Sequence, residues 1–141
     1  MAVYDAQLNN DARATRQYTD LDLFFGRKTS DNDVRKVTDA QAVKRSIRNL
    51  VQLNTYEKPF HPEISGDVRG MLFENMSPIT GHVIARKVEL VIENFEPRAR
   101  LVSVSCTPDF DRNAYEVTVE FYIVNAPTEL VDLSIMLERL R

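Results

Sequence analysis

Two pairs of carboxylates are the residues of this chain whose types and spacing could do acid–base chemistry. Asp20 and Asp22 alternate along one short segment, and Glu57 and Glu63 flank a proline-rich stretch. A glycosidase cleaves with two such groups, one of which needs a raised pKa to donate its proton. Acids on a strand or in a loop are usually solvated, and no convergent motif accompanies either pair, so we expect no catalysis here.

The residues that could bind a metal or act as a nucleophile are few. His61 and His82 fall on different predicted elements, and neither has a cysteine or acid at ligand spacing. Asp109 and Asp111 lack the further ligands of a calcium loop, which favours a turn. Cys106 alternates with two valines, which predicts a small side chain in the core. We therefore expect no metal and no cofactor.

The segment Glu96-Pro97-Arg98 places a proline between a predicted helix and a predicted strand. Arginine can form two parallel hydrogen bonds to a carboxylate, or bind carbonyls across an interface. Spacing alone favours a simpler interpretation, a local ion pair on the surface worth at most about 1 kcal/mol.

The charge balance argues against a nucleic-acid surface. The 141 residues include 18 Lys and Arg against 21 Asp and Glu, a formal net charge of -3. The basic helical face around Arg45 and Arg48 is therefore expected to be solvated. A single cysteine fits a reducing compartment. The chain starts without a signal peptide, and no apolar stretch approaches the roughly 20 residues that span a bilayer. These features predict a protein made in the cytoplasm without a membrane anchor.

The elements that must position these residues follow from hydrophobic periodicity. Residues 1–17 are polar and aperiodic, which predicts a flexible arm, and residues 18–141 are expected to form a single domain. Alternation of polar and apolar residues predicts short strands over 20–25 and 33–37.

Three helices are predicted in the middle of the chain. A capping signature at Thr38 begins the first. Ser77 followed by Pro78 begins the third, which runs to about Asn94. A shorter helix over 66–75 lies between them.

A proline-rich loop is predicted between the first two helices. Pro59 and Pro62 disfavour helix in the residues before them, so the stretch 54–65 is expected to be extended. We expect this loop to be ordered and pinned by Phe60.

The last third of the chain is predicted to be an antiparallel sheet. Alternation over 101–106, 115–123 and 131–138 predicts three strands, with Val102 and Cys106 facing the core. The predicted fold class is α+β: about three helices on a small antiparallel sheet, which is a C-terminal three-strand meander plus a short N-terminal strand or hairpin.

These segments together resemble the lysozyme-like baseplate wedge family of contractile phage tails, also called sheath initiators, with relatives in the type VI secretion baseplate. The resemblance runs from Asp20 to Arg139. It is carried by the order and spacing of Asp20-Leu21-Asp22, the helix from Ala42 to Leu50, the loop from Glu57 to Glu63, Leu72-Phe73-Glu74, Glu96-Pro97-Arg98 and the alternation that ends in Leu137-Glu138-Arg139.

The resemblance implies two binding surfaces on a protein that is not an enzyme. In the family the Glu-Pro-Arg triplet docks onto the helical core bundle of the wedge, which implies this role for Glu96, Pro97 and Arg98. The family's C-terminal sheet is similar to the handshake domain of the sheath protein, so the flanking strands 99–106 and 129–139 are expected to template sheath arms through free edges. The residues expected to contact these arms are Leu101, Ser103, Ser105, Asp132, Ser134 and Glu138.

The implied function is a structural component that joins wedge to sheath and nucleates the first sheath ring. Its partners would be baseplate wedge proteins and the tail sheath protein, with no nucleic acid and no membrane. About six copies are expected in the tail baseplate of the virion, assembled in the host cytoplasm. The alternatives are a muramidase that uses Glu57 or Glu63, a type VI secretion baseplate subunit, and an adaptor that binds one cytoplasmic protein.

Overall fold

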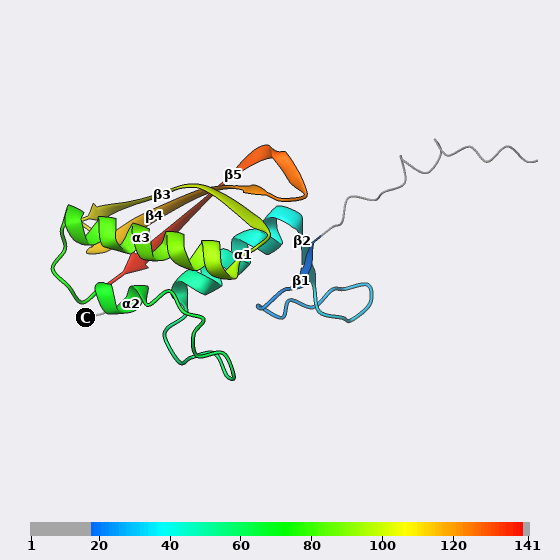
Figure 1. The fold of residues 1–141 in the computed structure, drawn as a ribbon. Coiled ribbons are helices and arrows are strands. Elements are labelled where there is room, and N and C mark those ends of the chain that lie inside the picture. Colours follow the sequence, from blue (N-terminus) through cyan, green and yellow to red (C-terminus); the bar gives the residue numbers. More distant parts are fainter. Residues whose placement is uncertain (1–17, 140–141) are drawn as a thin grey trace, which may run out of the picture. The chain divides into compact units, whose positions relative to one another are not determined.

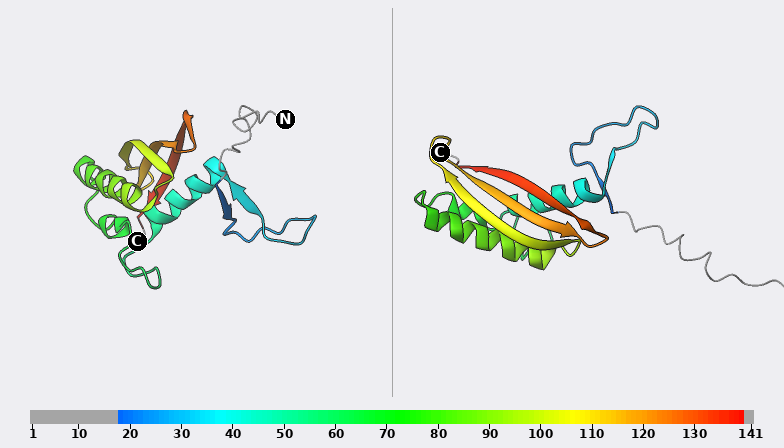
Figure 2. Two further views of the ribbon diagram at one scale, coloured as in Figure 1. Left: turned by 45° about the vertical axis from the view of Figure 1, so that its right-hand side comes forward. Right: turned by 90° about the horizontal axis from the view of Figure 1, so that it is seen from above.

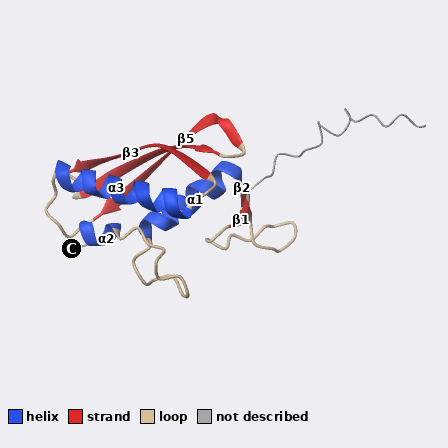
Figure 3. Ribbon diagram, viewed as in Figure 1, coloured by secondary structure: helices blue, strands red, loops and turns tan. Residues whose placement is uncertain are grey.

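The computed structural model describes residues 18–139, so the predicted arm over 1–17 lies outside the described residues. The element order is β1–β2–α1–α2–α3–β3–β4–β5 (Figure 1). The described part holds three helices and two antiparallel sheets, which confirms the α+β prediction (Figure 3). The chain divides into two compact units after Ala42, inside α1, and a single domain over 18–141 stays a prediction.

The first unit contains a two-stranded sheet of β1 (Thr19–Leu21) and β2 (Lys36–Thr38). The strand predicted over 20–25 was too long, because Asp22 turns the chain. Its carboxylate accepts a hydrogen bond from the Phe24 amide at 3.1 Å, and its carbonyl accepts one from Phe25 at 2.9 Å. Phe24 and Phe25 are consequently exposed.

The second predicted strand, over 33–37, was displaced. Only Val34 forms an isolated bridge, with Arg27, and regular pairing begins at Lys36.

The helices are α1 (Asp39–Gln52), α2 (Val68–Met71) and α3 (Pro78–Phe95). The start of α3 confirms the cap prediction, since Ser77 Oγ accepts a hydrogen bond from the Thr80 amide at 3.1 Å and Pro78 follows it. The second helix is shorter than predicted. The fully buried side chains of α1 and α3 include Val43, Ile47, Val51, Ile84, Val88 and Ile92.

The C-terminal sheet consists of β3 (Ala99–Asp109), β4 (Ala114–Ile123) and β5 (Ala126–Glu138) in the order β3-β4-β5. This arrangement confirms the predicted meander. Alternate residues of β4 are buried, and Val117, Val119 and Phe121 completely so, as expected for a central strand with one face on the core. Figure 2 shows α3 along one face of the sheet, and none of the described helices covers the opposite face.

A β-bulge in β3 corrects the prediction that Val102 faces the core. The pairing with β4 shifts between Leu101 and Ser103, so Val102 is 52% exposed while Leu101 is half-buried. Beyond the bulge Cys106 lies against α3, where a Cβ placed on Gly81 would come within 3.7 Å of the Cys106 sulfur.

The loop over 54–65 differs from the prediction. Phe60 does not pin it, since its side chain is 97% exposed. The loop is also not extended, because it folds into turns closed by hydrogen bonds from Glu57 N to Asn54 O and from His61 N to Lys58 O.

No helix within residues 18–139 combines the length and the apolar composition needed to cross a membrane.

Candidate partner-binding surfaces

Glu96 and Arg98 form a closed ion pair where α3 ends and β3 begins. Arg98 Nε lies 2.7 Å from Glu96 Oε1, and Arg98 Nη2 lies 3.0 Å from Glu96 Oε2. Pro97 between them has no amide to continue the helix, and Glu96 leaves helical geometry at φ -123° and ψ 78°. This two-point contact is the planar geometry that arginine forms with carboxylates.

The pair is not the surface pair that spacing alone favoured. The Glu96 side chain is only 3% exposed and that of Arg98 is 22% exposed. Burial by itself would raise the pKa of Glu96, but hydrogen bonds from Arg98 and Ser46, together with the charge of Arg98, outweigh it and hold that pKa below its ordinary value. Glu96 is therefore ionised at neutral pH and ties the end of α3 to α1.

The three residues of this segment differ in what they offer a partner. Pro97 is exposed and Arg98 is partly accessible, whereas Glu96 is enclosed. A partner could therefore contact the proline ring and the accessible side of the guanidinium, and the carboxylate would act by orienting Arg98.

The six residues expected to contact sheath arms do not share one environment. Ser103 and Ser134 lie on the outer sheet face, where their hydroxyls donate hydrogen bonds to carboxylates of β4, Ser103 to Glu120 at 2.7 Å and Ser134 to Glu116 at 3.0 Å. Ser105, Asp132 and Glu138 are also exposed, while the bulge leaves Leu101 half-buried.

The carboxylates considered for glycoside cleavage do not have the electrostatics of an acid–base pair. Hydrogen bonds from the backbone and side chain of Asn54 lower the pKa of Glu57. The pKa of Glu63 is lowered by its own backbone amide and by His61, whose Nδ1 lies 3.1 Å from Glu63 Oε1. A general acid needs the opposite shift.

The residues considered for metal or thiol chemistry have structural roles. The carboxylate of Asp109 accepts hydrogen bonds from the amides of Asp111 and Arg112, which makes it the turn residue that was predicted. Burial raises the pKa of the half-buried Cys106 thiol to about 11, so little of it is present as thiolate near neutral pH. Over residues 18–139 no three His, Cys, Asp or Glu side chains gather as metal ligands would.

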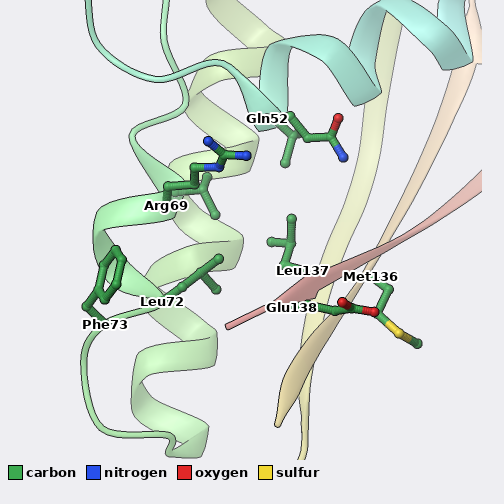
Figure 4. A pocket seen from close by; sticks show the side chains of 9 residues that line it. Gln52, Arg69, Leu72, Phe73, Met136, Leu137 and Glu138 are labelled. Atoms are coloured by element: carbon green, nitrogen blue, oxygen red, sulfur yellow. The ribbon is translucent and has the colours of Figure 1, made fainter. Parts of the chain in front are cut away.

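A pocket of about 280 Å³ at the end of β5 was missed by the sequence patterns. Figure 4 shows Leu72, which follows α2, and Leu137 of β5 pointing toward one another across it. Its other apolar lining residues include Val51 and Val68. The wall comes from three segments far apart in the chain, so no local motif could have indicated it.

Comparison with known proteins gives a consistent set of relatives. Residues 37–128 match the family model described as baseplate wedge protein gp25. The chain is similar to baseplate wedge protein gp25 of Enterobacteria phage T4, with 26% identity over 126 residues that cover 89% of this chain and 95% of that protein.

Two solved structures share the fold. One is a protein from Geobacter sulfurreducens provisionally identified as a tail lysozyme, with a TM-score of 0.64 and 19% identity over 71% of this chain and 90% of that one. The other is a chain of the anti-feeding prophage baseplate, with a TM-score of 0.61 and 19% identity over 89% of this chain and 88% of that one.

Proposed function

We propose that this chain is a structural subunit of a contractile-tail baseplate. The chain belongs to the family of baseplate wedge protein gp25. The observation that carries this proposal is the family match over residues 37–128. The matched range contains all three helices, the Glu96–Arg98 ion pair and the strands β3 and β4. Its place would be the tail baseplate of a virion, in about six copies.

The surface that we propose for docking on the wedge core bundle is the turn between α3 and β3. Pro97 and the accessible part of Arg98 would make the contact, and Glu96 would hold the guanidinium in position. The support is geometric: a buried carboxylate fixes the arginine through two hydrogen bonds, so little conformational freedom is lost when a partner binds.

The second proposed surface is the C-terminal sheet, which would accept extended arms of the sheath protein and so nucleate the first sheath ring. The sheet ends in two strands, β3 and β5, that each pair on one side only with a described strand. Such an edge can hydrogen-bond an added strand.

The experiment is co-sedimentation with purified wedge proteins. Arg98→Lys keeps the charge but loses the two-point contact, and we expect it to weaken association about tenfold. The matched control is Arg86→Lys, whose arginine pairs with Glu89 on the exposed side of α3. Equal binding by wild type and Arg98→Lys, with both folded, would remove this turn from the interface.

The same preparations discriminate the alternative functions. An adaptor would form a discrete heterodimer in place of a particle, and a type VI subunit would assemble with secretion-baseplate proteins. A muramidase would release fragments from cell walls and lose this activity in Glu57→Gln or Glu63→Gln. We expect no release by the wild type, because both carboxylates have a lowered pKa.

A further inference from the structure

The two edges of the C-terminal sheet present different backbone groups. In an antiparallel ladder, alternate residues direct both N–H and C=O toward the neighbouring strand, and the residues between them direct these groups away. Arg139 N donates to Asn113 O at 3.2 Å, so the main-chain groups of Arg139 and of every second residue before it in β5 face β4. Val124 N donates to Arg98 O at 3.0 Å, which sets it for β3.

The free edge of β5 is continuous. Its pairing with β4 runs without a shift from Leu130 to Glu138. By the alternation set at Arg139, the residues whose main-chain groups face outward are Asp132, Ser134, Met136 and Glu138. A strand laid beside β5 would therefore find an unbroken row of donors and acceptors.

The free edge of β3 is interrupted twice. The bulge at Val102 breaks the ladder near one end. Beyond the bulge the outward-facing residues are Val104, Cys106 and Pro108, and proline has no N–H to donate. Bulges and prolines are the devices by which natural sheets protect an edge from pairing.

The pocket lies beside the same end of β5. Met136, Leu137 and Glu138 form one of its walls, and the ends of α1 and α2 form the others. Leu137 faces the helices and is 7% exposed. On an added strand the residue next to Leu137 would face the same way, so an apolar side chain there could enter the pocket.

The outer face of β5 is acidic. Asp132 lies directly opposite Glu120 in the register, a like-charge pair that is unfavourable on its own. Glu138 lies six residues further along the same face. No described residue forms an ion pair with Asp132 or Glu138, so cations on an added strand would find complementary charge there.

We infer that the free edge of β5, and not that of β3, receives the added strand. The occupant is an extended segment with Lys or Arg facing Asp132 and Glu138, apolar residues on the opposite face, and one large apolar side chain in the pocket beside Leu137. This inference rests on the proposed function, since it specifies which edge takes the sheath arm.

The test is sheath assembly on baseplates that lack this protein and are reconstituted with purified variants. Ser134→Pro removes an outward-facing amide of β5, and Val104→Pro removes one of β3. We expect Ser134→Pro to reduce the number of sheathed baseplates in electron micrographs about tenfold, and Val104→Pro to change it less than about twofold. The reverse result would assign the arm to β3 and overturn the inference.

A second pair of variants covers the case in which a proline prevents folding. The double variant Asp132→Lys, Glu138→Lys changes exposed side chains only, and we expect it to reduce sheath assembly about tenfold at low salt. The control Glu93→Lys changes an exposed carboxylate of α3, away from β5, and should leave assembly unchanged. Undiminished assembly by the double variant would overturn the inference. If sheaths form without this protein at all, it is the proposed function that fails.

Discussion

Glu96 and Arg98 are joined by two hydrogen bonds across Pro97, with the carboxylate enclosed and the guanidinium partly open to solvent. The Arg98 amide and the Ser46 side chain of α1 add further hydrogen bonds to Glu96. The Glu96 carboxylate thus links the end of α3 to the start of β3 through Arg98, and to α1 through Ser46. The proposed docking residues are therefore also structural, and the two roles have to be separated by measurement.

Removing the charge of Glu96 should destabilise the fold. We expect Glu96→Gln to lower the free energy of unfolding in urea by about 2–4 kcal/mol, because it leaves Arg98 without its counter-ion in a partly buried site. The control Glu89→Gln breaks the exposed pair with Arg86 and should change stability by less than about 1 kcal/mol. Equal effects of the two variants would mean that the Glu96 pair behaves as a surface pair.

The same carboxylate should make stability depend on pH in acid. The pKa of Glu96 is lower in the folded protein than the ordinary value of 4.5, so the unfolded chain binds more protons between the two values. The stability that Glu96 contributes is present above the ordinary value and is lost as pH falls through the folded one. In urea titrations from about pH 7 to about pH 3, wild type should approach Glu96→Gln in stability. A constant difference between them would contradict this.

The thiol of Cys106 should react slowly. A pKa of about 11 in place of the ordinary value of 9.0 leaves about 90-fold less thiolate at pH 8. A thiolate of higher pKa is more nucleophilic, which offsets part of this factor, so we expect alkylation of the native protein by iodoacetamide to be about tenfold slower than that of Ser105→Cys in a Cys106→Ala background, where the thiol is exposed. Comparable rates would show that the strand opens readily at this position.

Phe60 should be dispensable for stability. Its side chain is almost fully exposed, so Phe60→Ser is expected to change the free energy of unfolding by less than about 0.5 kcal/mol. Phe121 in the centre of β4 is fully buried, and Phe121→Ala should lower the free energy of unfolding by about 3–5 kcal/mol. A large loss in Phe60→Ser, measured in the same urea titration, would restore the prediction that this residue pins the loop.

The sequence by itself determined the elements whose causes are local. Alternation in β4 and β5, the Ser77-Pro78 start of α3 and the stop before Pro97 depend on neighbours within a few residues, and all three are present in the structure. The order of these segments also supported the family resemblance.

Only the tertiary structure decided how each site residue is used, because burial depends on which distant segments meet. Ser46 and Glu96 are fifty residues apart in sequence, yet their contact helps to keep an enclosed carboxylate ionised. The bulge at Val102 arises in the pairing of β3 with β4, and it leaves Val102 exposed while Val104 and Cys106 stay half-buried as alternation predicts. Of the two interruptions of the β3 edge, Pro108 is visible in the sequence, whereas the bulge at Val102 depends on the pairing of β3 with β4.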